Sequence, residues 1–258
     1  CTLDAAVQEG NALGRADIVL PDTGEDTTYP LAHGTITGRL TITGPGLTPD
    51  GPTSAISLAS LRVAPAGALT LDRIGAWRSP GAENPAATVD GSLVVRRGAL
   101  FVPVVVTEAG QVTLLQAALA PTDPAVALTV RGTATVLYTT VLGSDAHPAI
   151  DVGPAAQVAI GASQIRHWGT DACVGPALTS LGHNVSAGSS CGLAGPGDIV
   201  SDPFSDDAAV DLVPAGVLGC GTDITVDAYG RVRPHDGDGD GTAACDAGPV
   251  ETTGTTEP

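Results

Sequence analysis

Pairs of apolar residues separated by one position recur along most of the chain, and each pair follows a small residue at a fixed distance. The small residue and its apolar pair occur at Gly38 (Leu40, Ile42), Gly67 (Leu69, Leu71), Gly91 (Leu93, Val95), Gly110 (Val112, Leu114), Gly132 (Ala134, Val136) and Ala156 (Val158, Ile160). Successive small residues are therefore 29, 24, 19, 22 and 24 positions apart. We call each small residue with its apolar pair a phrase. Apolar side chains at a spacing of two lie on one face of a strand, so each phrase predicts a strand with one buried face.

A repeat of this length indicates stacked coils rather than two facing sheets. A second apolar run follows in several intervals, at residues 103–107, 126–130 and 148–152. In a solenoid each coil stacks its apolar face on its neighbours, which explains both the repeat and its loops of variable length. A β-sandwich would need a hairpin turn roughly every 8 to 12 residues. We therefore predict an all-β fold, a parallel β-helix that forms a single domain over residues 1–251.

Residues 3–13 have the pattern of a short amphipathic helix. Leu3, Ala6, Val7 and Leu13 fall on one helical face, and Thr2 is in position to cap the helix. Because the end of a β-helix exposes apolar side chains and unpaired backbone, it needs a cap. We expect a helical cap at 1–16, coils at 17–170, a Gly-rich C-terminal closure at 171–251, and a polar, flexible tail or linker at 252–258.

The composition indicates which side chains fill the core and which classes of partner are disfavoured. Apolar residues make up 43% of the 258 residues, but aromatic residues only 3%, and Met is absent, so the core consists of small aliphatic side chains. The net charge is -17, and the 11 basic residues are all Arg. Such a field disfavours nucleic acid and anionic membranes as partners. The sequence contains no apolar run of the roughly 18 to 20 residues that a membrane-spanning helix needs.

The five cysteines favour disulfides over a zinc site. They lie at Cys1, Cys173, Cys191, Cys220 and Cys245, without the spacing of a zinc motif. Pairing neighbours, Cys173 with Cys191 and Cys220 with Cys245, would close two short loops in the C-terminal third. Each would contribute about 3 kcal/mol in the chain-entropy model. Disulfides imply an oxidising, extracytoplasmic location. Cys1 is then left over, as a free thiol, a thiol with an upstream partner or a lipidated residue.

The stretch DGDGDG, residues 236–241, matches the first half of a calcium-binding loop. Asp236, Asp238 and Asp240 alternate with glycine, which gives oxygen ligands around a tight turn. The second half differs, because position 12 of the loop is Ala247 and the nearby carboxylate is Asp246. Crowded carboxylates repel one another without a cation. We predict a structural Ca²⁺ site at Asp236, Asp238, Asp240 and Asp246, with a solvated acidic turn as the alternative.

Polysaccharide cleavage, known for other parallel β-helices, is the alternative function. Lyases of that kind need a basic residue beside bound calcium, and the hydrolases need paired acids. Arg96–Arg97 is an adjacent basic pair, but neighbouring strand residues point to opposite faces. Asp206–Asp207 is an adjacent acidic pair, but Pro203 before it and the two alanines after it favour a surface turn. The five histidines, at positions 33, 147, 167, 183 and 235, have no metal-binding spacing. We predict no catalytic residues.

Both ends of the chain carry motifs of one family. The opening CTLDAAVQEGNALGRADIVLP resembles the start of CSLREA-type secreted β-helix proteins, and the segments at 179–203, 208–211 and 231–251 resemble the choice-of-anchor region that closes many of them. Asp4–Ala5 and Pro249–Val250 depart from the usual residues. The resemblance implies a right-handed parallel β-helix on a bacterial or archaeal surface, usually joined to an anchor. It does not imply one activity.

Together these observations predict a non-catalytic, extracellular or cell-surface protein of a prokaryote. We expect an adhesin or structural scaffold that meets an unknown surface partner or assembles with copies of itself. No sequence feature identifies that partner.

Overall fold

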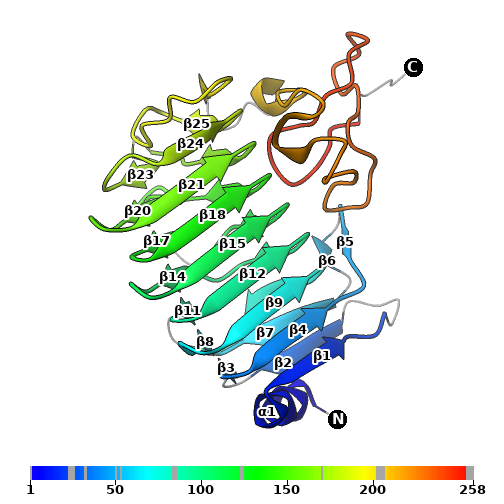
Figure 1. Ribbon diagram of the computed structural model, residues 1–258, viewed down its shortest axis with the longest axis vertical. Helices are drawn as coiled ribbons and strands as arrows, with labels where there is room; N and C mark the ends of the chain where they lie inside the picture. Colours follow the sequence, from blue (N-terminus) through cyan, green and yellow to red (C-terminus); the bar gives the residue numbers. More distant parts are fainter. Residues whose placement is uncertain are drawn as a thin grey trace.

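The chain forms a parallel β-helix built from three long sheets (Figure 1). The computed structural model describes residues 2–22, 27–31, 34–49, 51–52, 54–82, 86–122, 125–169, 171–201 and 207–253. Sheet A contains β1 (Arg15–Val19), β4 (Arg39–Thr43), β9 (Ala68–Asp72), β12 (Ser92–Arg96), β15 (Gln111–Leu115), β18 (Thr133–Leu137), β21 (Gln157–Gly161) and β24 (Thr179–Gly182). Its strands pair in parallel, each with the equivalent strand of the next coil.

Two further sheets complete each coil. Sheet B contains β2 (Thr27–Leu31), β7 (Ser54–Leu58), β10 (Gly75–Arg78), β13 (Ala99–Leu100), β16 (Ala118–Leu119), β19 (Thr140–Leu142), β22 (Gln164–Arg166), β25 (Val185–Ala187) and β26 (Ile199–Ser201). Sheet C contains β3 (Gly34–Ile36), β8 (Leu61–Val63), β11 (Ala87–Val89), β14 (Val104–Val106), β17 (Leu128–Val130), β20 (Ile150–Val152) and β23 (Cys173–Val174). A small antiparallel hairpin, β5 (Leu47–Thr48) and β6 (Gly51–Pro52), projects between β4 and β7.

The predicted phrases form the strands of sheet A. In the strand register, Leu40, Leu69, Leu93, Val112, Ala134 and Val158 are successive partners. These side chains are all at most 5% exposed and belong to one continuous core. The second predicted runs supply β14, β17 and β20 of sheet C. The predicted fold class is therefore confirmed.

A close approach between coils explains the glycine at Gly67, Gly91, Gly110 and Gly132. A Cβ atom at Gly110 would lie 2.0 Å from the carbonyl oxygen of Val89, and one at Gly67 would lie 2.2 Å from that of Ile36. Real Cβ atoms do not approach backbone oxygen this closely, so a side chain would push the coils apart. Ala156 occupies the equivalent position in the sixth phrase.

The corner from sheet A to sheet B has constant length. Two residues separate each strand of sheet A from the next strand of sheet B, from β9 onward. The first of the two has a positive φ between 47° and 58° at Arg73, Arg97, Gln116, Tyr138, Ala162 and His183. None of these is glycine. Because left-handed backbone is uncommon outside glycine and asparagine, the sequence carried no signal for this corner.

The helix α1 (Leu3–Leu13) covers the N-terminal end of the coils, as predicted. Thr2 caps it by accepting a hydrogen bond from the Ala5 backbone, and Leu3 and Val7 are buried. The prediction that Leu13 shares this buried face is wrong, since Leu13 is 71% exposed. Asn11 instead ties the helix to the coils through Thr35 and Thr37: its side chain donates to the Thr35 carbonyl and accepts from the Thr37 backbone.

The C-terminal residues 207–253, here called the flank segment, run along the side of the coils (Figure 1). Sheet C ends at β23, sheet A at β24 and sheet B at β26, so the coils extend beyond residue 170 and end at Ser201. The flank segment contains two short 3-10 helices, η1 (Asp207–Ala209) and η2 (Val217–Gly219). Val213, Cys220 and Cys245 pack against Tyr138 and Ala162 of the positive-φ corner. This segment therefore covers a lateral surface of the solenoid.

Candidate functional site

Both predicted disulfides are present. Cys173 in β23 bonds Cys191, which lies between β25 and β26, and Cys220 bonds Cys245 within the flank segment. All four cysteines are buried. The first bond fixes the last coil, and the second closes the flank segment on itself. Cys1 lies outside the described residues.

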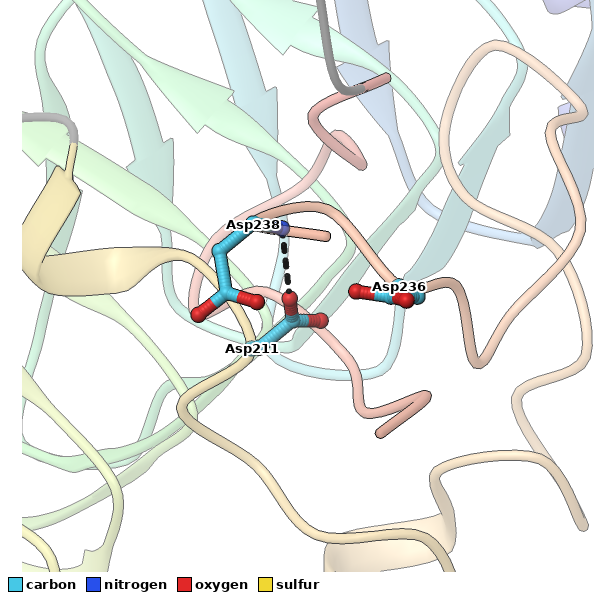
Figure 2. Close-up of side chains that lie close together, drawn as sticks. All are labelled: Asp211, Asp236 and Asp238. Carbon is cyan, nitrogen blue, oxygen red and sulfur yellow. Dashed lines mark hydrogen bonds between the residues drawn. The ribbon is translucent and has the colours of Figure 1, made fainter. Parts of the chain in front are cut away.

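Three aspartates of the flank segment converge on one point. Asp211, Asp236 and Asp238 each offer a carboxylate oxygen, and these oxygens lie within 4.8 Å of one another (Figure 2). Asp236 and Asp238 were predicted as ligands. Asp211 was not, because it lies 25 positions before Asp236 and carries no local motif. Only the fold of the flank segment places it beside the loop.

Backbone hydrogen bonds hold this loop in place. Asp211 Oδ2 accepts from the backbone nitrogens of Gly237 and Asp238, at 2.8 and 2.9 Å. Asp236 accepts from the backbone nitrogens of Gly239 and Gly241, whose φ angles are +79° and +90°. The positive φ angles explain the glycines of the motif. Asp211 Oδ1 is buried and has no hydrogen-bond partner among the described residues.

The structure does not bring the other two predicted ligands to this cluster. The Asp240 carboxylate accepts from the Thr242 backbone at 2.7 Å, in a tight turn at the tip of the loop. Asp246 is only 3% exposed, and its two oxygens accept from the Asp211 and Thr252 backbone nitrogens. Asp246 therefore positions the Asp211 backbone, and its oxygens are already engaged.

A buried ionic group lies beneath this loop. The Arg233 and Glu251 side chains are 0% and 1% exposed, and Arg233 Nε lies 2.5 Å from Glu251 Oε1. Burial raises the pKa of Glu251 to about 8, although Arg233 opposes the shift. Burial also lowers the pKa of Arg233, while its acidic neighbours oppose this. The Arg233 guanidinium stacks over the Tyr138 ring at 4.7 Å, so the group joins the flank segment to the coils.

The residues considered for catalysis are not assembled into a site in the described part of the chain. Arg96 is exposed on the outer face of sheet A, whereas Arg97 occupies the positive-φ corner and forms an ion pair with Asp72 at 2.9 Å. Asp207 begins η1, and Asp206 lies outside the described residues, as does His33. The remaining histidines are not among the residues that cluster as metal ligands.

The outer face of sheet A is an extended polar surface. It faces the viewer in Figure 1. Its middle row runs in register through Asp17, Thr41, Thr70, Val94, Thr113, Thr135, Ala159 and Thr179. The threonines of this row are exposed or half-buried, in contrast to the buried residues that alternate with them. In the row nearer the flank segment, Leu115 and Leu137 pack against that segment. The middle row stays open.

Comparison with known proteins gives no family model, curated protein or solved structure that matches this chain. The resemblance at the chain ends therefore remains a prediction. No described helix is long and apolar enough to cross a membrane. The functional argument rests on the geometry of the chain itself.

Proposed function

We propose that this protein is a non-catalytic scaffold or adhesin, outside the cell or on the cell surface of a prokaryote, that binds its partner through the outer face of sheet A. One observation carries the proposal. The flank segment covers the sheet A to sheet B corner and α1 covers one end of the coils, whereas the middle row of sheet A stays open. Sheet A has eight stacked strands, and five of the eight residues in its middle row are threonines.

Two features support the proposed location. The disulfides fit an oxidising environment, where such bonds form and persist. The acidic net charge of -17 keeps copies of the chain apart and soluble at high concentration. Both features agree with a secreted or surface-exposed protein.

The test compares two faces of the same solenoid. Thr113→Glu with Thr135→Glu changes the middle row of sheet A. Thr88→Glu with Thr129→Glu makes the same chemical change on the outer face of sheet C, where both residues are half-buried. We expect the sheet A variant to bind about tenfold more weakly to cells of the source species, measured with labelled protein. The two new carboxylates must lose their water when a partner covers sheet A, and this weakens binding. The sheet C variant should bind like the unmodified protein.

Sedimentation of both variants separates adhesion from self-assembly. If the unmodified protein sediments as a larger species and only the sheet A variant becomes a monomer, its partner is a second copy. Equal cell binding by all three proteins would overturn the proposal. Cleavage of a polysaccharide by the unmodified protein would overturn its non-catalytic part.

We propose further that the aspartate cluster binds calcium and thereby fixes the flank segment. Carboxylate oxygens are hard ligands that suit calcium, and Asp211 Oδ1 has no hydrogen bond to satisfy it. A ligand that binds only the folded state adds about 2.7 kcal/mol of stability at a concentration 100 times its dissociation constant.

Calcium titration followed by calorimetry tests this assignment. Asp211→Asn with Asp238→Asn should abolish the calcium-dependent rise in melting temperature. Asp223→Asn, at an exposed aspartate of the same segment, provides the control. An unchanged melting temperature in calcium and in EDTA for the unmodified protein would show that the loop is only an acidic turn.

A further inference from the structure

The arginines divide into two groups by their partners. Eight of the 11 have a side-chain hydrogen bond or ion pair: Arg62, Arg73, Arg78, Arg97, Arg131, Arg166, Arg231 and Arg233. For Arg15, Arg39 and Arg96 the described part of the chain offers no such partner. All three are exposed and lie on the outer face of sheet A. In a chain with 28 acidic residues, this segregation needs an explanation.

Arg15 and Arg39 are direct neighbours. They are register partners in β1 and β4, so their backbones lie about 4.8 Å apart on the same face. Like charges directly opposite each other on paired strands are destabilising. The adjacent carboxylate, Asp17, is two positions along β1 and forms no ion pair with either arginine. An anionic group between the two guanidinium groups would remove this repulsion.

A depression surrounds the arginine pair. It has a volume of about 440 Å³ and is lined by Arg15, Ala16, Asp17, Arg39 and Thr41. Two guanidinium groups can bind a carboxylate through paired hydrogen bonds. The Asp17 carboxylate and the Thr41 hydroxyl can bind neighbouring hydroxyl groups. The depression therefore combines an anion site with acceptors for hydroxyl donors.

This chemistry selects among anionic partners. The net charge of -17 and Asp17 oppose any polyanion, and they oppose a densely charged polyphosphate most strongly. A sugar acid carries one carboxylate among several hydroxyl groups, which matches the mixed lining. Beyond the arginines, the outermost row continues through Ala68 and then through the uncharged polar residues Ser92, Gln111, Thr133 and Gln157. A linear chain of sugars can lie along this row and the threonine row.

We infer that the outer face of sheet A binds an acidic polysaccharide of the uronic-acid type, with Arg15 and Arg39 holding a carboxylate. This inference rests on the proposed function and names the partner class of the same face. It requires no reaction, since the site binds the polymer without breaking a bond.

Binding of galacturonic acid oligomers, measured by calorimetry at low salt, tests the inference. Galactose oligomers of equal length are the uncharged probe, and dextran sulfate is the sulfated one. Arg15→Ala with Arg39→Ala should weaken binding of the acidic oligomer at least about tenfold, because it removes the charged donors that would hold the carboxylate. Arg62→Ala with Arg131→Ala changes the net charge equally and leaves sheet A intact, so it should bind within about twofold of the unmodified protein.

The outcomes separate this inference from the function on which it rests. Absence of oligomer binding, equal loss in both arginine variants, or binding of only dextran sulfate would overturn the uronic-acid assignment. If the assignment fails while Thr113→Glu with Thr135→Glu still reduces cell binding, the function of sheet A stands. If the arginine variant loses oligomer binding while the threonine variant binds cells normally, the anion site stands and the proposed adhesion surface fails.

Discussion

The coils and the flank segment are stabilised by different kinds of interaction. In the coils, small aliphatic residues stack in register and parallel backbone ladders join each strand to the next. The flank segment of residues 207–253 contains only isolated bridges and short 3-10 turns. It is held by a disulfide, a buried Arg233–Glu251 pair and aspartates that accept backbone hydrogen bonds. The comparison shows that one chain can build a repetitive unit around its own core and a non-repetitive unit that packs on the outside of it.

The largest expected effect concerns the buried ion pair of the flank segment. Above about pH 8, where Glu251 is ionised, Arg233→Met should lower the free energy of unfolding by about 3 to 5 kcal/mol, because it leaves the Glu251 carboxylate buried without its cation. Arg233→Met with Glu251→Leu should recover much of this loss, since both charges are then gone. Urea denaturation of the unmodified protein, the single variant and the double variant measures these free energies of unfolding. Equal stability of the single and double variants would contradict this explanation.

The same pair makes the stability of the flank segment depend on pH. The pKa of Glu251 is raised to about 8 in the folded protein, whereas the pKa of an unfolded glutamate is about 4.3. The folded state therefore binds more protons between these values, and the free energy of unfolding falls as pH rises from about 4 to 8. Glu251→Gln should flatten this dependence in urea titrations. Glu9→Gln, at an exposed residue of α1, should leave it unchanged.

Removing each disulfide should affect one region at a time. Cys220→Ala with Cys245→Ala opens a loop with a sequence separation of 25, and Cys173→Ala with Cys191→Ala opens one of 18. Each pair should cost about 3 kcal/mol. Hydrogen exchange should show faster exchange in the flank segment for the first pair and in β23 for the second. Uniform acceleration along the chain would mean that the two regions unfold as one unit.

A smaller effect is expected from adding a side-chain atom to the narrow space between two coils. Gly110→Ala should cost about 1 to 3 kcal/mol, because the new Cβ meets the Val89 carbonyl oxygen and the coils must separate. Ala156→Gly removes a Cβ at the equivalent position and should cost about 1 kcal/mol or less. Thermal unfolding followed by circular dichroism compares the two. A neutral Gly110→Ala variant would show that the coil spacing adapts.

Sequence patterns predicted the coils because the same phrase occurs six times. Leu40 and Ile42, for example, are apolar residues two positions apart, a spacing that predicts a strand, and each repetition of the phrase strengthens the prediction. Sheet B was not anticipated, since strands such as β13 and β16 contain only two residues each. The positive-φ corner was missed because Arg, Gln, Tyr, Ala and His share no common chemistry there.

The flank segment was only partly predictable. Local spacing was enough for both cysteine pairs, and it also brought Asp236 and Asp238 into one turn, whose role as a calcium site stays a prediction. The role of Asp211 depends on a contact across 25 positions, and the burial of Arg233 depends on Tyr138 of a distant coil. Non-local contacts of this kind have no period, so they leave no pattern in the sequence.

From β9 onward the corner between sheets A and B has two residues, so the coils differ in length mainly at the corner between sheets B and C. Between sheets B and C, the connection is 2 residues after β7, 3 after β13 and 8 after β10 and β16. Foreign peptides inserted there would be displayed as a column, at heights fixed by the rise of the coil. The edge between sheets B and C is thus a natural place to graft ligands, and the molecule could be used as a ruler for spacing them.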